Sequence, residues 1–141
     1  MLINIPDTNK FYLYGGVAQE PLNGIAKLTV NSHTDCKWEI INPNYIDKAQ
    51  FLKGRFGFNG TFYDGKFYFL FGCQMYDKML QERTCLNEIV IFDPYSNDLE
   101  VNYPFHVPEK LFIPRKYYAG FLLGNTYFCH GGVDSNNKML G

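Results

Sequence analysis

Apolar residues in this chain recur at every second position over short runs, whereas helical spacing is almost absent. The runs are rich in Phe, Tyr, Val and Ile and are bounded by Gly, Pro, Asn and Asp, a pattern typical of β-strands. It predicts strands near residues 2–5, 11–15, 25–30, 37–41, 57–63, 66–71, 88–93, 99–103, 117–123 and 126–130. The chain is therefore expected to be all-β.

A short aromatic run that leads into Gly occurs three times, as NKFYLYGG at 9–16, GKFYFLFGC at 65–73 and NTYFCHGG at 125–132. If Gly15, Gly72 and Gly131 are equivalent, the two spacings are nearly the same, since 72 − 15 = 57 and 131 − 72 = 59. A period above ~40 residues with four short strands in each repeat is the signature of a β-propeller blade. The spacing predicts a partial propeller made of four-stranded antiparallel blades.

Two arginines support the same period, since Arg55 and Arg115 each precede a first strand and their spacing is similar (115 − 55 = 60). The blades are expected at residues 1–42, 55–104 and 115–141. The last range holds only the inner half of a blade, so the ring is expected to be incomplete. The remaining blades would come from the rest of a longer chain or from another subunit, because a propeller typically closes with at least four.

These motifs resemble the kelch repeat, in which an apolar strand ends in a Gly-Gly pair, an LN-led strand ends near Asp, and a Trp lies in the fourth strand. The matching residues are Gly15, Gly16, Leu22, Asn23 and Trp38 in the first repeat, Gly72, Leu86, Asn87 and Asp93 in the second, and Arg115, Gly131 and Gly132 in the third. Cys73 takes the place of the second Gly and Leu99 that of the Trp. The resemblance implies a scaffold or adaptor in cytoskeletal, ciliary or ubiquitin-ligase assemblies.

Composition and charge narrow the function classes. The net charge is −1 and the pI is near 6.3, which argues against the strongly basic face of a duplex-binding protein. The longest strongly apolar run, FYFLF at 67–71, is far shorter than the ~20 residues that cross a bilayer, and the N-terminus has no secretory pattern. A cytoplasmic protein without membrane or nucleic-acid partners is expected.

The four cysteines, Cys36, Cys73, Cys85 and Cys129, form no CxxC pair and no zinc-site spacing. They are expected to be free thiols in the cytosol. No metal ion or cofactor is expected.

The lengths of the connections between strands predict that the long loops lie together on one side of the ring. The connection at 73–85 and those at 42–55 and 104–115 are long, and in a four-stranded meander they emerge on one side of the ring, opposite the tight turns. The protein-binding residues are predicted to be Tyr76, Met79 and Arg83, together with Lys53, because apolar anchors beside charges are typical of protein interfaces. The alternative is that the 73–85 loop only caps its own blade.

Arg55 and Arg115 are expected to bond backbone groups between adjacent blades, although either could instead anchor a ligand carboxylate. Two further function classes stay open. Some kelch-type propellers are oxidases, lyases or isomerases, but the three histidines here lie in separate segments and no catalytic constellation replaces them, so an enzyme is not expected. The segment 53–62 also resembles an RNA-binding strand, although the other parts of such a domain are missing.

Overall fold

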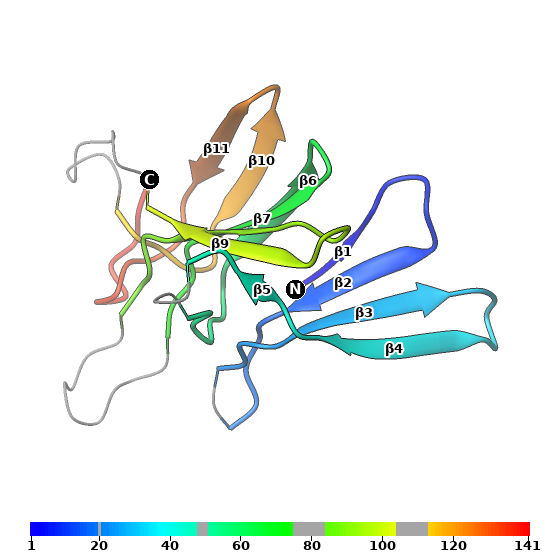
Figure 1. Cartoon of the computed structure of the whole chain (residues 1–141). Coiled ribbons are helices and arrows are strands. Elements are labelled where there is room, and N and C mark those ends of the chain that lie inside the picture. The colour runs from blue at the N-terminus through cyan, green and yellow to red at the C-terminus, as the bar shows by residue number, and fades with distance from the viewer. Residues whose placement is uncertain (20, 48–50, 75–83, 104–112) are drawn as a thin grey trace.

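A computed structural model describes the chain except for residues 20, 48–50, 75–83 and 104–112. The described residues form three sheets whose consecutive strands are antiparallel (Figure 1), and none of the sheets closes into a barrel. The all-β prediction is confirmed. Within the described ranges there is no helix long and apolar enough to span a membrane.

The first sheet contains four strands in sequence order, β1 (Leu2–Asn4), β2 (Lys10–Tyr14), β3 (Ile25–Val30) and β4 (Cys36–Ile41). Tight turns join β1 to β2 and β3 to β4. In the first turn Asp7 adopts a left-handed backbone (φ 58°), and the Thr8 amide donates to the Ile5 carbonyl at 3.2 Å. Asp tolerates this conformation better than most residues, which is why PDTNK reverses the chain here.

The second sheet repeats this order with β6 (Asn59–Tyr63), β7 (Lys66–Leu70), β8 (Ile89–Phe92) and β9 (Asp98–Asn102). Asp64 and Gly65 join β6 to β7 with positive φ at both residues (46° and 77°), as a two-residue hairpin turn requires. A further strand, β5 (Asn44–Tyr45), lies parallel to β9 at the edge of this sheet. The hydrophobic pattern does not predict β5, because two residues cannot display an alternation.

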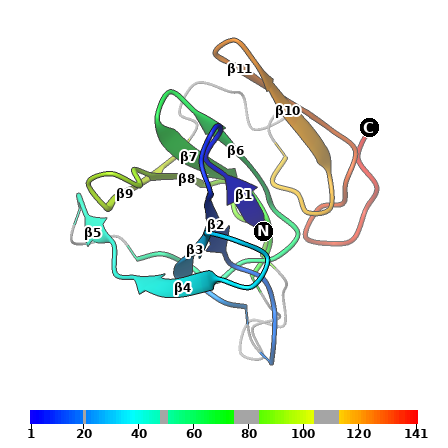
Figure 2. The ribbon, with the colours of Figure 1, turned by 90° about the vertical axis from the view of Figure 1, so that its right-hand side faces the viewer.

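The third sheet is a hairpin of β10 (Ala119–Leu123) and β11 (Thr126–His130). The three sheets spread from a common side. Their first strands lie next to one another, since β1 contacts β6 and β6 contacts β10. Figure 2 shows the sheets diverging from this side, with β4 and β9 far from it.

The main core lies between the first two sheets. It consists of the buried side chains Ile5, Tyr12, Tyr14, Ile25, Leu52, Phe67, Phe69, Val90, Phe92, Leu99 and Val101. The Tyr12 ring centroid lies 4.9 Å from that of Phe67, and the Tyr14 centroid lies 4.7 Å from that of Phe69. A smaller cluster of Leu70, Phe71 and Tyr118 joins the second sheet to the third. The main core is built mostly by side chains that alternate along the strands, whereas Phe71 and Tyr118 of the smaller cluster lie just outside β7 and β10.

Candidate functional site

Three hydrogen bonds establish which residues of the three sheets are equivalent. The amides of Leu22, Leu86 and Leu140 donate to the carbonyl oxygens of Gly16, Gly72 and Gly132, at 2.9, 2.7 and 3.0 Å respectively. The spacings between equivalent glycines are therefore 72 − 16 = 56 and 132 − 72 = 60, and the second spacing equals that of the two arginines.

The expected equivalence of the glycines is therefore wrong by one residue in the second repeat. Gly72 corresponds to the second Gly of the pair, and Phe71, rather than Cys73 as expected, is the residue that departs from the Gly-Gly motif. Phe71 still adopts the left-handed backbone of its counterparts, with φ 57° against 60° at Gly15 and 70° at Gly131. The fold keeps this conformation although Phe disfavours it, because the side chain is buried (2% exposed) against Tyr118.

The second glycine of the pair is required by close packing in two of the sheets. A Cβ atom on Gly72 would lie 2.7 Å from the Phe58 Cβ and 2.9 Å from the Phe56 carbonyl oxygen. A Cβ atom on Gly132 would lie 2.6 Å from the Lys116 carbonyl oxygen. Both residues also have positive φ, so any other side chain would be strained and would clash with backbone.

Arg55 connects the first and second sheets. Its carbonyl oxygen accepts from the Gly16 amide at 2.9 Å, and its amide donates to the Leu22 carbonyl at 3.3 Å. Its side chain turns into the second sheet, where Nη1 donates to the Phe71 carbonyl at 3.1 Å. The guanidinium is fully buried, which leaves it out of reach of a ligand carboxylate in solvent.

A buried carboxylate completes this junction. Glu88, the residue before β8, is 1% exposed and accepts from Arg55 Nη2 at 2.8 Å. The Lys53 ammonium and the Tyr103 hydroxyl (3.3 Å) both contact the other carboxylate oxygen. A carboxylate with three donors is well compensated for its loss of water, and removal of Glu88 itself would leave the buried Arg55 guanidinium without its counter-charge.

Burial raises the pKa of Tyr14 to about 12, and the nearby Arg55 guanidinium opposes part of this shift. The Tyr14 hydroxyl donates to the Lys53 carbonyl at 3.0 Å, and its ring lies under the guanidinium, 5.8 Å from centroid to Cζ. The tyrosine therefore stays neutral at physiological pH and covers the ion pair on the side of the first sheet.

Arg115 occupies the same position in the third sheet. Its Nη1 donates to the Gly131 carbonyl at 3.1 Å, as Arg55 does to Phe71, and its carbonyl accepts from the Gly72 amide at 3.0 Å. Among the described residues Arg115 has no ion pair of the kind that Glu88 supplies. The two arginines thus share a backbone role, and in the first repeat the position of Glu88 is occupied by Gly24.

The expectation of four free thiols is wrong for Cys73 and Cys85, which form a disulfide. The two residues lie opposite each other in an antiparallel bridge, where side chains approach closely. The corresponding bridges, Val17 with Pro21 and Val133 with Met139, show that this connection returns on itself in every repeat. Cys36 and Cys129 are free and exposed.

The predicted protein-binding residues are only partly described. Tyr76, Met79 and Arg83 lie outside the described residues, in the segment that the Cys73–Cys85 disulfide closes. Lys53 is described, and its side chain is 41% exposed while its ammonium pairs with Glu88. Lys53 therefore lies at the solvent-exposed end of the ion-pair cluster that it forms with Glu88 and Arg55.

Asp93, a predicted blade-motif residue, builds the turn between β8 and β9. Its Oδ1 accepts from the Tyr95 and Ser96 amides at 2.8 and 3.2 Å, which fixes the turn without a glycine. Asp93 therefore has a local structural role.

Trp38, the remaining motif residue, lies on a sheet face that none of the other described strands covers. It is opposite Leu28 in the first sheet, as Leu99 is opposite Phe92 in the second, so Trp38 and Leu99 are equivalent. Leu99 is 1% exposed, whereas Trp38 is 54% exposed.

The same contrast extends over the whole face. Ile40 is 77% exposed and its counterpart Val101 is 4% exposed. We call the two surfaces the outer face of the first sheet (Leu2, Phe11, Leu13, Leu28, Trp38, Ile40) and the covered face of the second sheet (Phe67, Phe69, Val90, Phe92, Leu99, Val101). Sequence reasoning identifies Trp38 as a motif residue but misses the face to which it belongs.

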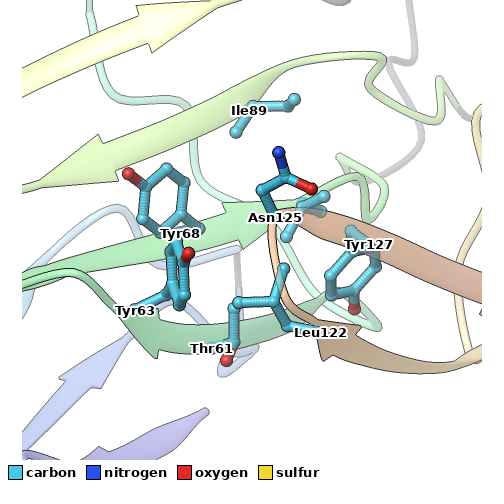
Figure 3. A pocket seen from close by; sticks show the side chains of 8 residues that line it. Thr61, Tyr63, Tyr68, Ile89, Leu122, Asn125 and Tyr127 are labelled. Atoms are coloured by element: carbon cyan, nitrogen blue, oxygen red, sulfur yellow. The ribbon is translucent and has the colours of Figure 1, made fainter.

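A cavity of about 320 Å³ opens between the second and third sheets (Figure 3). Its lining is largely apolar and consists of Thr61, Tyr63, Tyr68, Leu70 and Ile89 from the second sheet and Leu122, Asn125 and Tyr127 from the third. Within the described ranges no three His, Cys, Asp or Glu side chains come together as a metal site would require.

No protein-family model and no curated protein matches the chain. Among solved structures, one described as "Structure of YjhT" matches 91% of this chain with a TM-score of 0.62 and 19% sequence identity. The match covers 32% of that chain, so the present chain spans less than half of the length of YjhT. At this identity the similarity concerns the fold alone.

Proposed function

We propose that this chain is a kelch-type β-propeller segment that acts as a protein–protein interaction scaffold or adaptor within a larger chain or assembly. The observation that carries the proposal is the outer face of the first sheet, where Trp38 and Ile40 are exposed at positions that are buried in the second sheet. An exposed apolar face of this kind is expected to be covered by further protein of the larger chain or assembly, because its contact with water is unfavourable, whereas the surface that captures a separate partner is proposed elsewhere on the molecule.

The propeller assignment is supported by the equivalence of the three sheets. The first strands β1, β6 and β10 lie side by side, each strand leads to the next by an antiparallel meander, and backbone bonds from Gly16 and Gly72 join neighbouring sheets. Further blades, from a longer chain or another subunit, would complete the ring.

The partner-binding surface is proposed on the side of the long connections. In Figure 1 the tight turns β1–β2 and β3–β4 lie on one side of the first sheet, and the connection from β2 to β3 lies on the other. Lys53 reaches solvent near that connection, and the disulfide holds the ends of the segment with Tyr76, Met79 and Arg83. A constrained loop loses less entropy on binding.

A capture experiment tests this surface. The simultaneous change Tyr76→Ala, Met79→Ala and Arg83→Ala should abolish recovery of the partner from the native source, whereas changes in the 31–35 and 94–97 turns should leave recovery unchanged. Lys53 is kept, because its loss would disturb Glu88. Partner loss only with the turn variant would contradict the proposed side, and loss with neither variant would favour a loop that only caps its own sheet.

The cellular setting follows from the kelch resemblance alone. We propose a cytoplasmic protein of cytoskeletal or ciliary assemblies, since scaffolds of this kind serve there. Fluorescence microscopy of the tagged chain in its native cell checks this, and a signal confined to membrane-bound compartments would contradict it.

A further inference from the structure

The Cys73–Cys85 disulfide lies at a position that the other two sheets build without sulfur. Their corresponding residue pairs form the same isolated antiparallel bridge, and these pairs are Val17 with Pro21 and Val133 with Met139. The backbone of this connection therefore takes its course in two of the three repeats without a covalent bond. A disulfide that is not needed for the course of the backbone is free to serve another purpose.

The surroundings of the two sulfurs also suit reduced cysteines. Cys73 is fully buried and Cys85 is 5% exposed. A reduced cysteine behaves as a small apolar side chain, much like the valine that takes the place of Cys73 in the other two sheets. Beside the pair, the Gln74 amide donates to the Thr84 carbonyl at 3.0 Å, a bond that does not involve sulfur. The pair can therefore be reduced without leaving a polar group stranded in the core.

The two cysteines are anchored differently. The amide and the carbonyl of Cys73 both bond to Phe56, at 3.0 Å each, so a second β-bridge holds this residue from its other side. The Cys85 amide instead donates to the Ser135 hydroxyl at 2.9 Å, and no second β-bridge to Cys85 occurs in the described part of the chain. After reduction Cys73 would thus stay in place, where it can form the disulfide again, while the Cys85 end gains freedom.

The disulfide closes the longest of the three connections. Its cysteines are 12 residues apart in the sequence, whereas the corresponding residues of the first and third repeats are 21 − 17 = 4 and 139 − 133 = 6 apart. The entropy cost of closing a loop rises with its length, so a bridge without a covalent bond is weakest in the second repeat. Loss of the disulfide should therefore release residues 74–84, although the shorter connections stay closed without one.

We propose that Cys73 and Cys85 form a reversible redox switch that sets the freedom of residues 74–84 and, through it, the strength of partner binding. The oxidised pair holds the segment closed for binding, and the reduced pair releases it. Disulfides in cytoplasmic proteins are mostly transient and redox-sensing, which agrees with the proposed cellular setting. The effect on binding rests on the proposed function, because the predicted binding residues other than Lys53 lie in this segment.

Reduction by a dithiol proceeds in two exchange steps. A thiolate of the dithiol attacks Sγ of Cys85, the less buried sulfur, and Cys73 leaves with the electron pair of the broken bond and takes up a proton. The second thiol of the reagent then attacks the mixed disulfide and releases Cys85, which also takes up a proton. The dithiol becomes a cyclic disulfide. Glutathione disulfide reverses the change, since it accepts the two electrons and leaves as two molecules of glutathione.

Amide hydrogen exchange in the protein purified with its natural neighbours tests the switch. The chain carries Cys36→Ser and Cys129→Ser, so that only its disulfide pair responds to thiol reagents. We expect dithiothreitol to accelerate exchange in residues 74–84 about 10-fold while β7 and β8 stay protected, and glutathione disulfide to restore the slow rate. The matched control, Cys73→Val with Cys85→Val, should exchange at the fast rate with or without dithiothreitol.

An unchanged exchange rate in dithiothreitol would overturn the inference, because the disulfide would then be inert, and so would loss of protection in β7 and β8, because the disulfide would then be required for the fold. The double valine variant should also recover about 10-fold less partner than the natural protein. Full recovery by this variant, with recovery still lost in the triple alanine variant, would overturn the control of binding. If the triple alanine variant recovers the partner while exchange responds to dithiothreitol, the proposed binding surface falls and the redox pair stands.

Discussion

The outer face of the first sheet and the covered face of the second sheet have the same construction and opposite surroundings. Both contain apolar side chains at equivalent positions of three antiparallel strands, β2 to β4 in the first sheet and β7 to β9 in the second. The covered face packs against Tyr12 and Tyr14, whereas the outer face leaves Trp38 and Ile40 exposed. The comparison shows that the strand sequences alone place apolar side chains on such a face, whether or not a neighbouring sheet covers it.

A sheet with two apolar faces is stable only between two neighbours, because each face must be removed from water. The second sheet has a neighbour on both sides, and its strands β7 and β8 contain fully buried aromatics. The first sheet has a described neighbour on one side only. Its outer face is therefore the observation on which the proposed contact with further protein rests.

The largest expected effect is a difference in the free energy of unfolding lost on truncation at one pair of equivalent positions, one on each face. Phe69→Ala should lower the free energy of unfolding by ~3–5 kcal/mol, because it opens a cavity in the main core. Leu13→Ala, at the counterpart on the outer face, should cost about 1 kcal/mol, since Leu13 is only half-buried. Urea unfolding of the two variants checks this, and equal losses would remove the contrast between the faces.

The second effect concerns the polar junction beside the covered face. Glu88→Ala should lower the free energy of unfolding by ~3–5 kcal/mol, because it leaves the Arg55 guanidinium buried without its carboxylate. The control is Glu39→Ala, which removes the exposed ion pair with Lys27 and should change little. If both variants unfolded at the same urea concentration, the junction would not contribute to the packing of the two sheets.

The third effect concerns the disulfide. Replacing Cys73 and Cys85 together by Val, the residue at positions 17 and 133, should lower the free energy of unfolding by about 2–3 kcal/mol through loop entropy. Thermal unfolding with and without reductant measures this. Reductant should destabilise the natural protein and leave the double variant unchanged. A reductant effect of equal size in both proteins would contradict the pairing.

The smallest effect is the pH dependence from Tyr14. Its folded-state pKa, about 12, exceeds the usual value of 10, so the protonated hydroxyl stabilises the fold below pH 10 and this contribution is lost as pH rises toward 12. The stability difference between the natural protein and Tyr14→Phe should therefore shrink by about 1–2 kcal/mol between pH 8 and pH 11.5. A difference that does not change with pH would show that Tyr14 titrates normally.

Much of the fold can be predicted from local pattern. The alternation predicts the strands at 25–30 and 126–130 with their observed ends, because it stops there at turn residues. The position of Phe71 cannot be predicted in this way, since a Gly-rich motif suggests Gly72 as the first member of the pair. Backbone bonds across sheets, which the sequence does not display, decide that register.

The candidate site is less predictable than the fold. The spacing to Arg115 identifies Arg55, but its partner Glu88 has no counterpart in the first repeat, because Gly24 occupies the same position there. The sequence does not indicate the disulfide, because the spacing of Cys73 and Cys85 carries no recognised motif. In all three repeats this connection folds back so that its two ends lie opposite each other. That repeated geometry is the signal that could have identified Cys73 and Cys85 as a pair.

Hydroxyl-radical footprinting of Trp38 tests the central claim most directly, because this residue is the only tryptophan and lies on the outer face of the first sheet. The rate of Trp38 oxidation is measured by mass spectrometry in the isolated chain and in the protein purified with its natural neighbours. If further protein covers the outer face as the first sheet covers the second, Trp38 should oxidise quickly in the isolated chain and about 10-fold more slowly in the native state. Equal oxidation in both samples would contradict the account.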